Sequence, residues 1–169
     1  YGAWPLAMFM GSSSDGRVAV GQQATGFVGL SWTPDAGFER LQPGMWYWAE
    51  SVSPGGESAV GYEYSGPQPE RAIRWFRDQD TGPWTRELLP TPIDAGRCFA
   101  AGVSREGRVI VGTVAPPGQA ASAVIWRRRA GVVEASVLRP ASPLDFSLEY
   151  VDGSGETAAG VLSNNGNYR

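Results

Sequence analysis

The side chains that most often perform catalysis or bind metals are scarce in this sequence. Its 169 residues include no histidine, and Cys98 is the one cysteine. This excludes His-based catalytic triads, His-ligated zinc, Cys-based metal sites and an intramolecular disulfide. Cys98 lies in the apolar stretch Cys98-Phe99-Ala100-Ala101, which predicts a buried small hydrophobic residue and not a nucleophile.

Carboxylates are the remaining candidates for acid–base chemistry. A glycosidase needs two carboxyl groups about 5–10 Å apart across a cleft. Nothing in the sequence brings two candidates together, and no Asp-x-Asp-x-Asp-Gly calcium loop occurs. A carboxylate-based glycoside hydrolase is therefore the least favoured function, and we predict no catalytic residue, no metal site and no cofactor. The carboxylates that could form such a pair are Asp94, Asp145, Glu149 and Asp152.

The densest cluster of side chains suited to binding is aromatic. Met45-Trp46-Tyr47-Trp48 is followed by two tyrosines on the next predicted strand. Side chains alternate along a strand, so Trp46 and Trp48 share one face and Tyr47 takes the other with Met45. One set should pack in the core, while the other could form a stacking platform for a sugar or a patch for a partner protein. The candidate binding residues are Trp46, Tyr47, Trp48, Tyr62 and Tyr64.

Charge and hydropathy limit the classes of partner. The net charge of -3 predicts no general affinity for nucleic acid. The basic run Arg127-Arg128-Arg129 follows a Trp and predicts a solvated strand end. No run approaches the roughly 18 apolar residues of a membrane-spanning helix. A first residue Tyr1, without Met, is typical of a processed form or of part of a longer product.

A nine-residue motif recurs four times without gaps. Its pattern is Ser or Asp, two variable residues, Gly, four residues, and a closing Gly. The closing glycines are separated by 40, 51 and 48 residues (61−21, 112−61, 160−112). Such a period is typical of repeat folds. The four copies span residues 13–21, 53–61, 104–112 and 152–160.

The motif predicts a β-hairpin. A Ser or Asp at the head of a turn can accept hydrogen bonds from backbone amides just after it. The first Gly takes the positive φ that other residues resist, which we predict for Gly16, Gly56, Gly107 and Gly155. The second Gly, inside the following strand, allows another backbone or a bulky ring to approach closely.

A second motif follows in three copies: a small residue, an aliphatic residue, any residue, and Trp. It predicts a strand with the aliphatic residue and the Trp on one face, and the Trp should be a buried plug between neighbouring sheets. With one further short strand, each unit has four strands and no helical periodicity. The tryptophans are Trp32, Trp75 and Trp126.

Four short antiparallel strands every 40–50 residues are typical of the blade of a β-propeller. We therefore predict one all-β domain over residues 1–169, a β-propeller-like array of about three and a half four-stranded blades. A β-sandwich is the main competitor, but it would not require the same two motifs in successive quarters of the chain. The units span approximately 7–42, 43–90, 96–140 and, in part, 145–169.

The chain resembles the bacterial HAF-repeat proteins, also called extracellular propeller-like proteins. Their Val-Ser-x-Asp-Gly turn, Val-rich strand ending in Gly, and Ala-Phe-x-Trp match residues 103–107, 109–112 and 123–126 here. Leu30, Ile73 and Val124 replace the aromatic before the Trp, and the His of the repeat is missing. The resemblance implies an exported bacterial protein of the periplasm, cell surface or exterior, without a specified active site.

Two functions follow from these patterns. The first is a non-enzymatic protein-interaction or scaffolding propeller, as a subunit of an envelope assembly. The second is a lectin-like glycan binder, suggested by the seven tryptophans. The incomplete fourth unit leaves an open flank, which a sheet edge tolerates poorly. We expect residues 1–6 to pair with residues 156–164; another subunit or further blades are the alternatives.

Overall fold

The computed structural model describes residues 7–23, 28–42, 46–64, 66–67, 69–78, 82–92, 96–139, 144–164 and 167–168. Over these ranges the chain forms strands and no helix, so the described residues contain no helix that could cross a membrane. The strands are β1 (Ala7–Ser12), β2 (Ala19–Gln23), β3 (Val28–Thr33), β4 (Gly37–Arg40), β5 (Trp46–Val52), β6 (Ser58–Tyr64), β7 (Arg71–Phe76), β8 (Thr85–Leu88), β9 (Arg97–Val103), β10 (Val109–Ala115), β11 (Ser122–Arg129), β12 (Val132–Leu138), β13 (Asp145–Val151), β14 (Ala158–Asn164) and β15 (Asn167–Tyr168).

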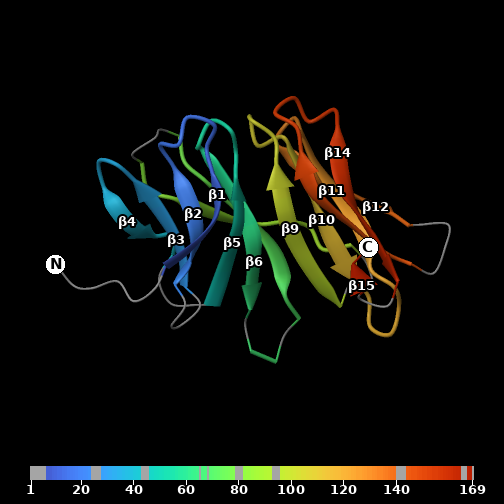
Figure 1. The fold of residues 1–169 in the computed structure, drawn as a ribbon. Coiled ribbons are helices and arrows are strands. Elements are labelled where there is room, and N and C mark those ends of the chain that lie inside the picture. The colour runs from blue at the N-terminus through green and yellow to red at the C-terminus, as the bar shows by residue number, and fades with distance from the viewer. Residues whose placement is uncertain are drawn as a thin grey trace.

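The strands form four antiparallel sheets in which each strand pairs with its neighbours in the sequence. Sheet 1 is β1–β4, sheet 2 is β5–β8, sheet 3 is β9–β12 and sheet 4 is β13–β15. They stand side by side in a row from sheet 1 at one end to sheet 4 at the other (Figure 1). The first strands β1, β5, β9 and β13 each contact the next in the series. The predicted all-β class and the four-stranded units are confirmed, with three full sheets and a shorter fourth.

The hairpin between the first two strands has the same turn in all four sheets. In sheet 1 the Gly16 amide donates to the Ser13 carbonyl at 3.0 Å, and the Val18 amide donates to the Ser13 hydroxyl at 2.9 Å. In sheet 4 the Asp152 carboxylate takes the role of the hydroxyl and accepts from the Thr157 amide at 3.3 Å. As predicted, positive φ occurs at each turn glycine: Gly16 (70°), Gly56 (87°), Gly107 (65°) and Gly155 (81°).

The closing glycine of the motif lies opposite a register shift in the first strand. In sheet 3, Gly112 pairs with Ala100, and the register shifts beside this pair. A Cβ added to Gly112 would overlap the Phe99 carbonyl oxygen and lie 3.0 Å from the Ala100 Cα. The same overlap with a first-strand carbonyl recurs in the other sheets, so only glycine fits this bulge. The equivalent residues are Gly21, Gly61 and Gly160.

The core lies between successive sheets. Trp126 is fully buried, clusters with Val60 and Leu89 of sheet 2, and donates from Nε1 to the Pro90 carbonyl at 2.8 Å. Trp75 is equally buried against sheet 1, so two of the three predicted plugs are confirmed. Trp32 is only half-buried, because no sheet precedes sheet 1 in the described part of the chain.

The described chain does not form a closed ring. Sheets 1 and 4 occupy opposite ends of the row (Figure 1). The expected pairing of residues 1–6 with residues 156–164 involves a segment outside the described residues. Gly16 of sheet 1 has open space around it, as expected for a sheet with no neighbour on that side.

Candidate binding site

The aromatic residues of β5 divide between the two faces of sheet 2. Tyr47 is buried and contacts Trp75 edge to face, with ring centroids 5.7 Å apart. It therefore belongs to the core between sheets 1 and 2. Trp46 and Trp48 lie on the opposite face, toward sheet 3, as strand alternation predicts. The structure thus separates Tyr47 from the other four candidate residues.

Trp46 and Trp48 form two stacked pairs with the tyrosines of β6. Trp46 pairs with Tyr64 and Trp48 with Tyr62 across the strands. The ring centroids are 5.5 Å and 5.3 Å apart, and the planes are within 8° and 7° of parallel. Phe99 of β9 then meets Tyr62 edge to face at 4.9 Å. These contacts make a preformed aromatic surface that bridges sheets 2 and 3.

This surface lines a groove of about 450 Å³. Trp46 is 48% exposed, so about half of its surface is accessible to a ligand. Glu70 and Arg97 form a salt bridge of 3.2 Å at the groove. The Arg97 side chain is largely exposed, so this ion pair places a polar, solvent-accessible group beside the aromatic rings. We call this feature the aromatic groove; its lining residues are Trp46, Trp48, Tyr62, Tyr64, Glu70, Arg97 and Phe99.

The aromatic groove continues toward the loops of sheets 2 and 3. A second hollow of about 620 Å³ shares Tyr64, Glu70 and Arg97 with it. Its wall is formed by the β6–β7 and β10–β11 loops, including Pro69 and Pro117. The two hollows therefore adjoin each other at the junction of the two sheets.

Three of the seven lining residues, Glu70, Arg97 and Phe99, were not among the predicted ones. Phe99 could have been found from the repeat, because its carbonyl faces Gly112 as the Trp48 carbonyl faces Gly61. Phe99 and Trp48 are therefore equivalent positions in neighbouring sheets. Glu70 and Arg97 lie outside both motifs, and no sequence signal pairs them.

Buried charge supports the strand behind the aromatic groove. The Glu63 side chain has no exposed surface and forms ion pairs with Arg71 and Arg86. The Arg86 guanidinium also lies over the Tyr47 ring, 5.8 Å from its centroid. Because Glu63 lies between Tyr62 and Tyr64, this network fixes the β6 backbone that carries both tyrosines.

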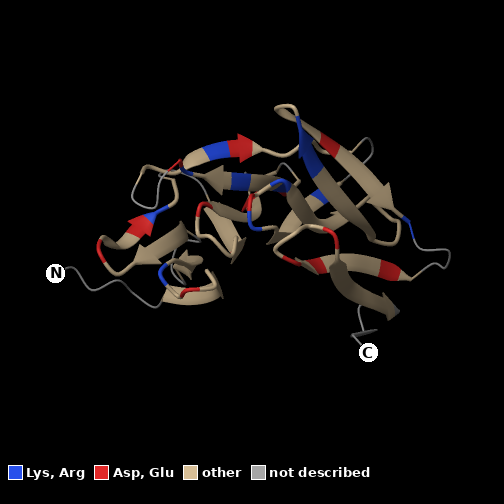
Figure 2. Ribbon diagram, turned by 90° about the horizontal axis from the view of Figure 1, so that it is seen from above, with Lys and Arg blue, Asp and Glu red and all other residues tan. Residues whose placement is uncertain are grey.

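Charged segments are spread along the row of sheets and do not gather on one side (Figure 2).

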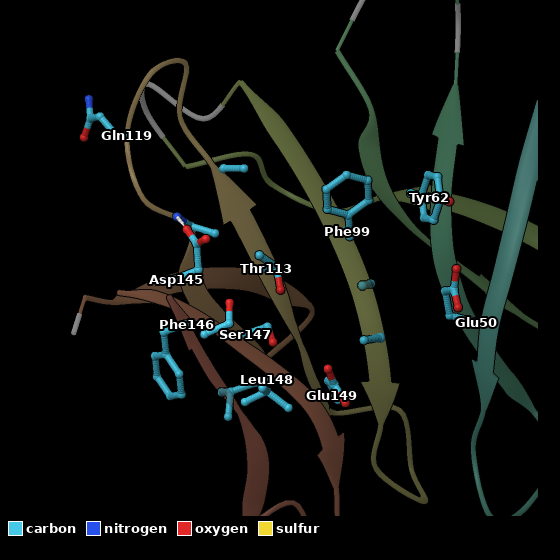
Figure 3. A pocket seen from close by; sticks show the side chains of 16 residues that line it. Glu50, Tyr62, Phe99, Thr113, Gln119, Asp145, Phe146, Ser147, Leu148 and Glu149 are labelled. Atoms are coloured by element: carbon cyan, nitrogen blue, oxygen red, sulfur yellow. Dashed lines mark hydrogen bonds between the residues drawn. The ribbon is translucent and has the colours of Figure 1, made fainter. Parts of the chain in front are cut away.

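Three carboxylates line a further recess of about 610 Å³ between sheets 2, 3 and 4, which shares Tyr62 and Phe99 with the aromatic groove. Asp145 and Glu149 come from β13, and Glu50 comes from β5 across the recess (Figure 3). Burial raises the pKa of Glu50, while Asp145 accepts a hydrogen bond from the Ala121 amide at 2.7 Å. The structure thus brings two of the four candidate carboxylates, Asp145 and Glu149, to one recess.

The other two candidate carboxylates do not join them. Asp152 lies in the β13–β14 turn, where hydrogen bonds from Ser154 and nearby amides lower its pKa. Asp94 lies outside the described residues. Within the described ranges, no three His, Cys, Asp or Glu residues come close enough together to hold a metal ion. Burial raises the pKa of the Cys98 thiol to about 12, which makes it an inert core residue.

Comparison with known proteins identifies the fold and no family. No family model and no curated protein matches this sequence. Among solved structures, TolB from Acinetobacter baumannii matches 98% of this chain with a TM-score of 0.57 and 13% sequence identity. The match covers 45% of the TolB chain, which contains a β-propeller domain. This chain is therefore an all-β array of antiparallel sheets whose fold is similar to that of TolB.

Proposed function

We propose that this chain is a non-enzymatic binding module of the β-propeller class, and that its aromatic groove binds an extended segment of a partner protein. The observation that carries the proposal is the arrangement of Trp46, Trp48, Tyr62 and Tyr64 on one exposed wall. Aromatic residues in a hollow of this kind are typical hot spots of protein interfaces.

The geometry favours an extended and proline-rich segment. Proline-rich segments in the polyproline II conformation bind grooves lined with aromatic rings and lose little entropy on binding. Successive stacked pairs along β5 are two residues apart, about 6.6–7 Å, which is close to the ~6.2 Å rise of two polyproline II residues. The rings are already stacked on each other, so binding need not order them.

Selection of peptides tests this proposal. A display library of proline-rich peptides is screened against the chain, and the dissociation constants of the peptides obtained are measured for Trp46→Ser. Loss of a hot-spot ring should weaken binding by about 30-fold or more, which corresponds to ~2 kcal/mol. Tyr150→Ser is the matched control, because Tyr150 is 71% exposed and lies in sheet 4. Equal affinity of both variants for every selected peptide would contradict the proposal.

A glycan is the second candidate ligand, and the Glu70–Arg97 pair is the observation that favours it. Sugars stack on exposed indoles and also need charged or polar groups for their hydroxyls. A glycan array distinguishes the two candidates. Binding to one class of glycan that is lost in both Trp46→Ser and Glu70→Gln would support the lectin, and an array without signal would leave the protein segment as the ligand.

Membership of the HAF-repeat group and an exported location belong to the same proposal. They are supported by the turn motif and by the Val-rich strands that end in glycine. An envelope assembly would then be the source of the partner protein. Fractionation of the native source tests the location: recovery of the chain with cytoplasmic markers would contradict export.

A further inference from the structure

The face of β5 that carries Trp46 and Trp48 continues to a carboxylate. Side chains two residues apart share one face of a strand, so Glu50 follows Trp48 along the same wall. Glu50 is four positions after Trp46, about 13 Å away along an extended strand. Tyr62 and Phe99 line both the aromatic groove and the recess that Glu50 enters. A segment that lies on the stacked rings is therefore led toward this carboxylate.

Glu50 owes its direction to the β-bulge of its strand. The register between β5 and β6 shifts between Ala49 and Ser51, which leaves Glu50 as the extra residue. Glu149 is the extra residue at the same place in sheet 4, and Ala101 is the one in sheet 3. All three line the recess. The small Ala101 thus leaves room between the two glutamates, which lie on opposite sides of β9 (Figure 3).

The recess holds negative charge without a basic side chain. Its described lining residues include Glu50, Asp145 and Glu149, and none of them is Lys or Arg. In the described part of the chain, neither glutamate takes part in an ion pair. Burial therefore raises the pKa of Glu50, since no positive charge offsets the loss of water. A cation brought in by a ligand would supply the missing partner.

We propose that the segment bound in the aromatic groove carries a basic residue, and that this residue pairs with Glu50 in the recess. The inference rests on the proposed function and deepens it, because it adds a charged contact to a site of aromatic rings. The recess of about 610 Å³ is large enough to admit a side chain. Arg suits it best, because a guanidinium binds a carboxylate through two hydrogen bonds and also packs on aromatic rings.

The spacing along β5 sets the position of the basic residue in the segment. A polyproline II chain rises ~3.1 Å per residue, so four of its residues span ~12.4 Å, close to the separation of Trp46 and Glu50. The basic residue should therefore follow about two positions beyond the residue that lies on the Trp48 ring. It marks the end of the segment that points away from Trp46.

A double-mutant cycle with peptides selected by display tests this pairing. The selected sequences should share a basic residue at one end of the proline-rich run. Replacing it by Gln should weaken binding to the wild-type chain about tenfold or more, as expected for a charged hydrogen bond. The same peptide change should cost Glu50→Gln less than about twofold, because the protein's charge is already gone. Glu39→Gln, an exposed carboxylate on β4, is the matched control and should keep the tenfold difference.

Thermal melting of the free protein separates binding from a structural role. Because its pKa is raised in the folded state, the charged form of Glu50 opposes folding at pH values above that raised pKa. At neutral pH, Glu50→Gln should therefore melt at or above the wild-type temperature. A lower melting temperature would show that Glu50 already has a stabilising partner in the free chain, which contradicts the proposal.

The experiment distinguishes two failures. Unchanged affinity of Trp46→Ser for every peptide would refute the proposed function, and the pairing with it. If Trp46→Ser weakens binding, the groove stands. In that case, selected peptides without a shared basic residue, or a full tenfold difference kept by Glu50→Gln, would overturn the pairing with Glu50 alone.

Discussion

Replacing Gly112 by Ala tests the physical reason for the repeat. Gly112 is the closing glycine of sheet 3, and an added methyl group would overlap the Phe99 carbonyl. The second neighbour, the Ala100 Cα at 3.0 Å, is also backbone and cannot rotate away. The first strand of the sheet must therefore shift away from its partner at the bulge.

The magnitude follows from what the shift disrupts. Two ladder hydrogen bonds at about 1 kcal/mol each and an overpacking cost of about 1–3 kcal/mol oppose the variant. Reduced entropy of the unfolded chain offsets about 0.4–1 kcal/mol. The free energy of unfolding should fall by roughly 2–4.6 kcal/mol, which lowers Tm by about 4–18 °C for a domain of this size.

Urea denaturation and thermal melting of both proteins measure this change. Gly153→Ala is the control, because its Cβ would lie 3.8 Å from the Arg105 Cβ, at ordinary contact distance. The equivalent residues in the other copies, Ser14, Pro54 and Arg105, already carry side chains. A loss below about 0.5 kcal/mol for Gly112→Ala, comparable with surface substitutions, would refute the steric explanation of the repeated glycine.

Three further predictions concern ionisable groups. Glu63→Gln should lower the free energy of unfolding by about 1.5–3 kcal/mol, because Arg71 and Arg86, which are partly exposed, lose their charged partner. Glu106→Gln, in an exposed pair, should cost less than about 1 kcal/mol. Equal losses for the two variants would contradict this prediction. Cys98, with its pKa raised to about 12 by burial, should react with a thiol reagent at pH 8 only after unfolding. Since hydrogen bonds from Ser154 lower the pKa of Asp152, the carboxylate supports its turn above the ordinary pKa of Asp and loses that role as pH falls through the lowered value. NMR titration of Asp152 should find its midpoint below 3.8, and a midpoint at or above that value would contradict this.

The sheets could be predicted because each copy of the repeat encodes its own hairpin. Ser13 and Gly16 specify the turn locally, through side-chain acceptance and positive φ. Strand alternation likewise predicts from the sequence that Tyr47 lies on the opposite face from Trp46 and Trp48, as the structure shows. These features depend on residues within a few positions of one another.

Features that depend on contacts between sheets were not predictable. Glu70 reaches Arg97 only because sheets 2 and 3 stand side by side. Glu50 and Glu149 line one recess although they are about a hundred residues apart in the sequence. No periodicity encodes such pairs, since they arise from the packing of sheets whose order is known only after folding. The partial exposure of Trp32 was unpredictable for the same reason. Its motif is the one that Trp75 and Trp126 share, and those two are buried only because another sheet packs against them.

The role of the aromatic groove is tested most directly by fluorine NMR with 5-fluorotryptophan. The seven tryptophans give separate signals, and Trp46→Phe and Trp48→Phe assign the two in the groove. Titration with the tightest proline-rich peptide from display should shift the Trp46 and Trp48 signals and leave those of the buried Trp75 and Trp126 in place. Saturable binding that leaves Trp46 and Trp48 unchanged, while other tryptophan signals move, would contradict the proposed function.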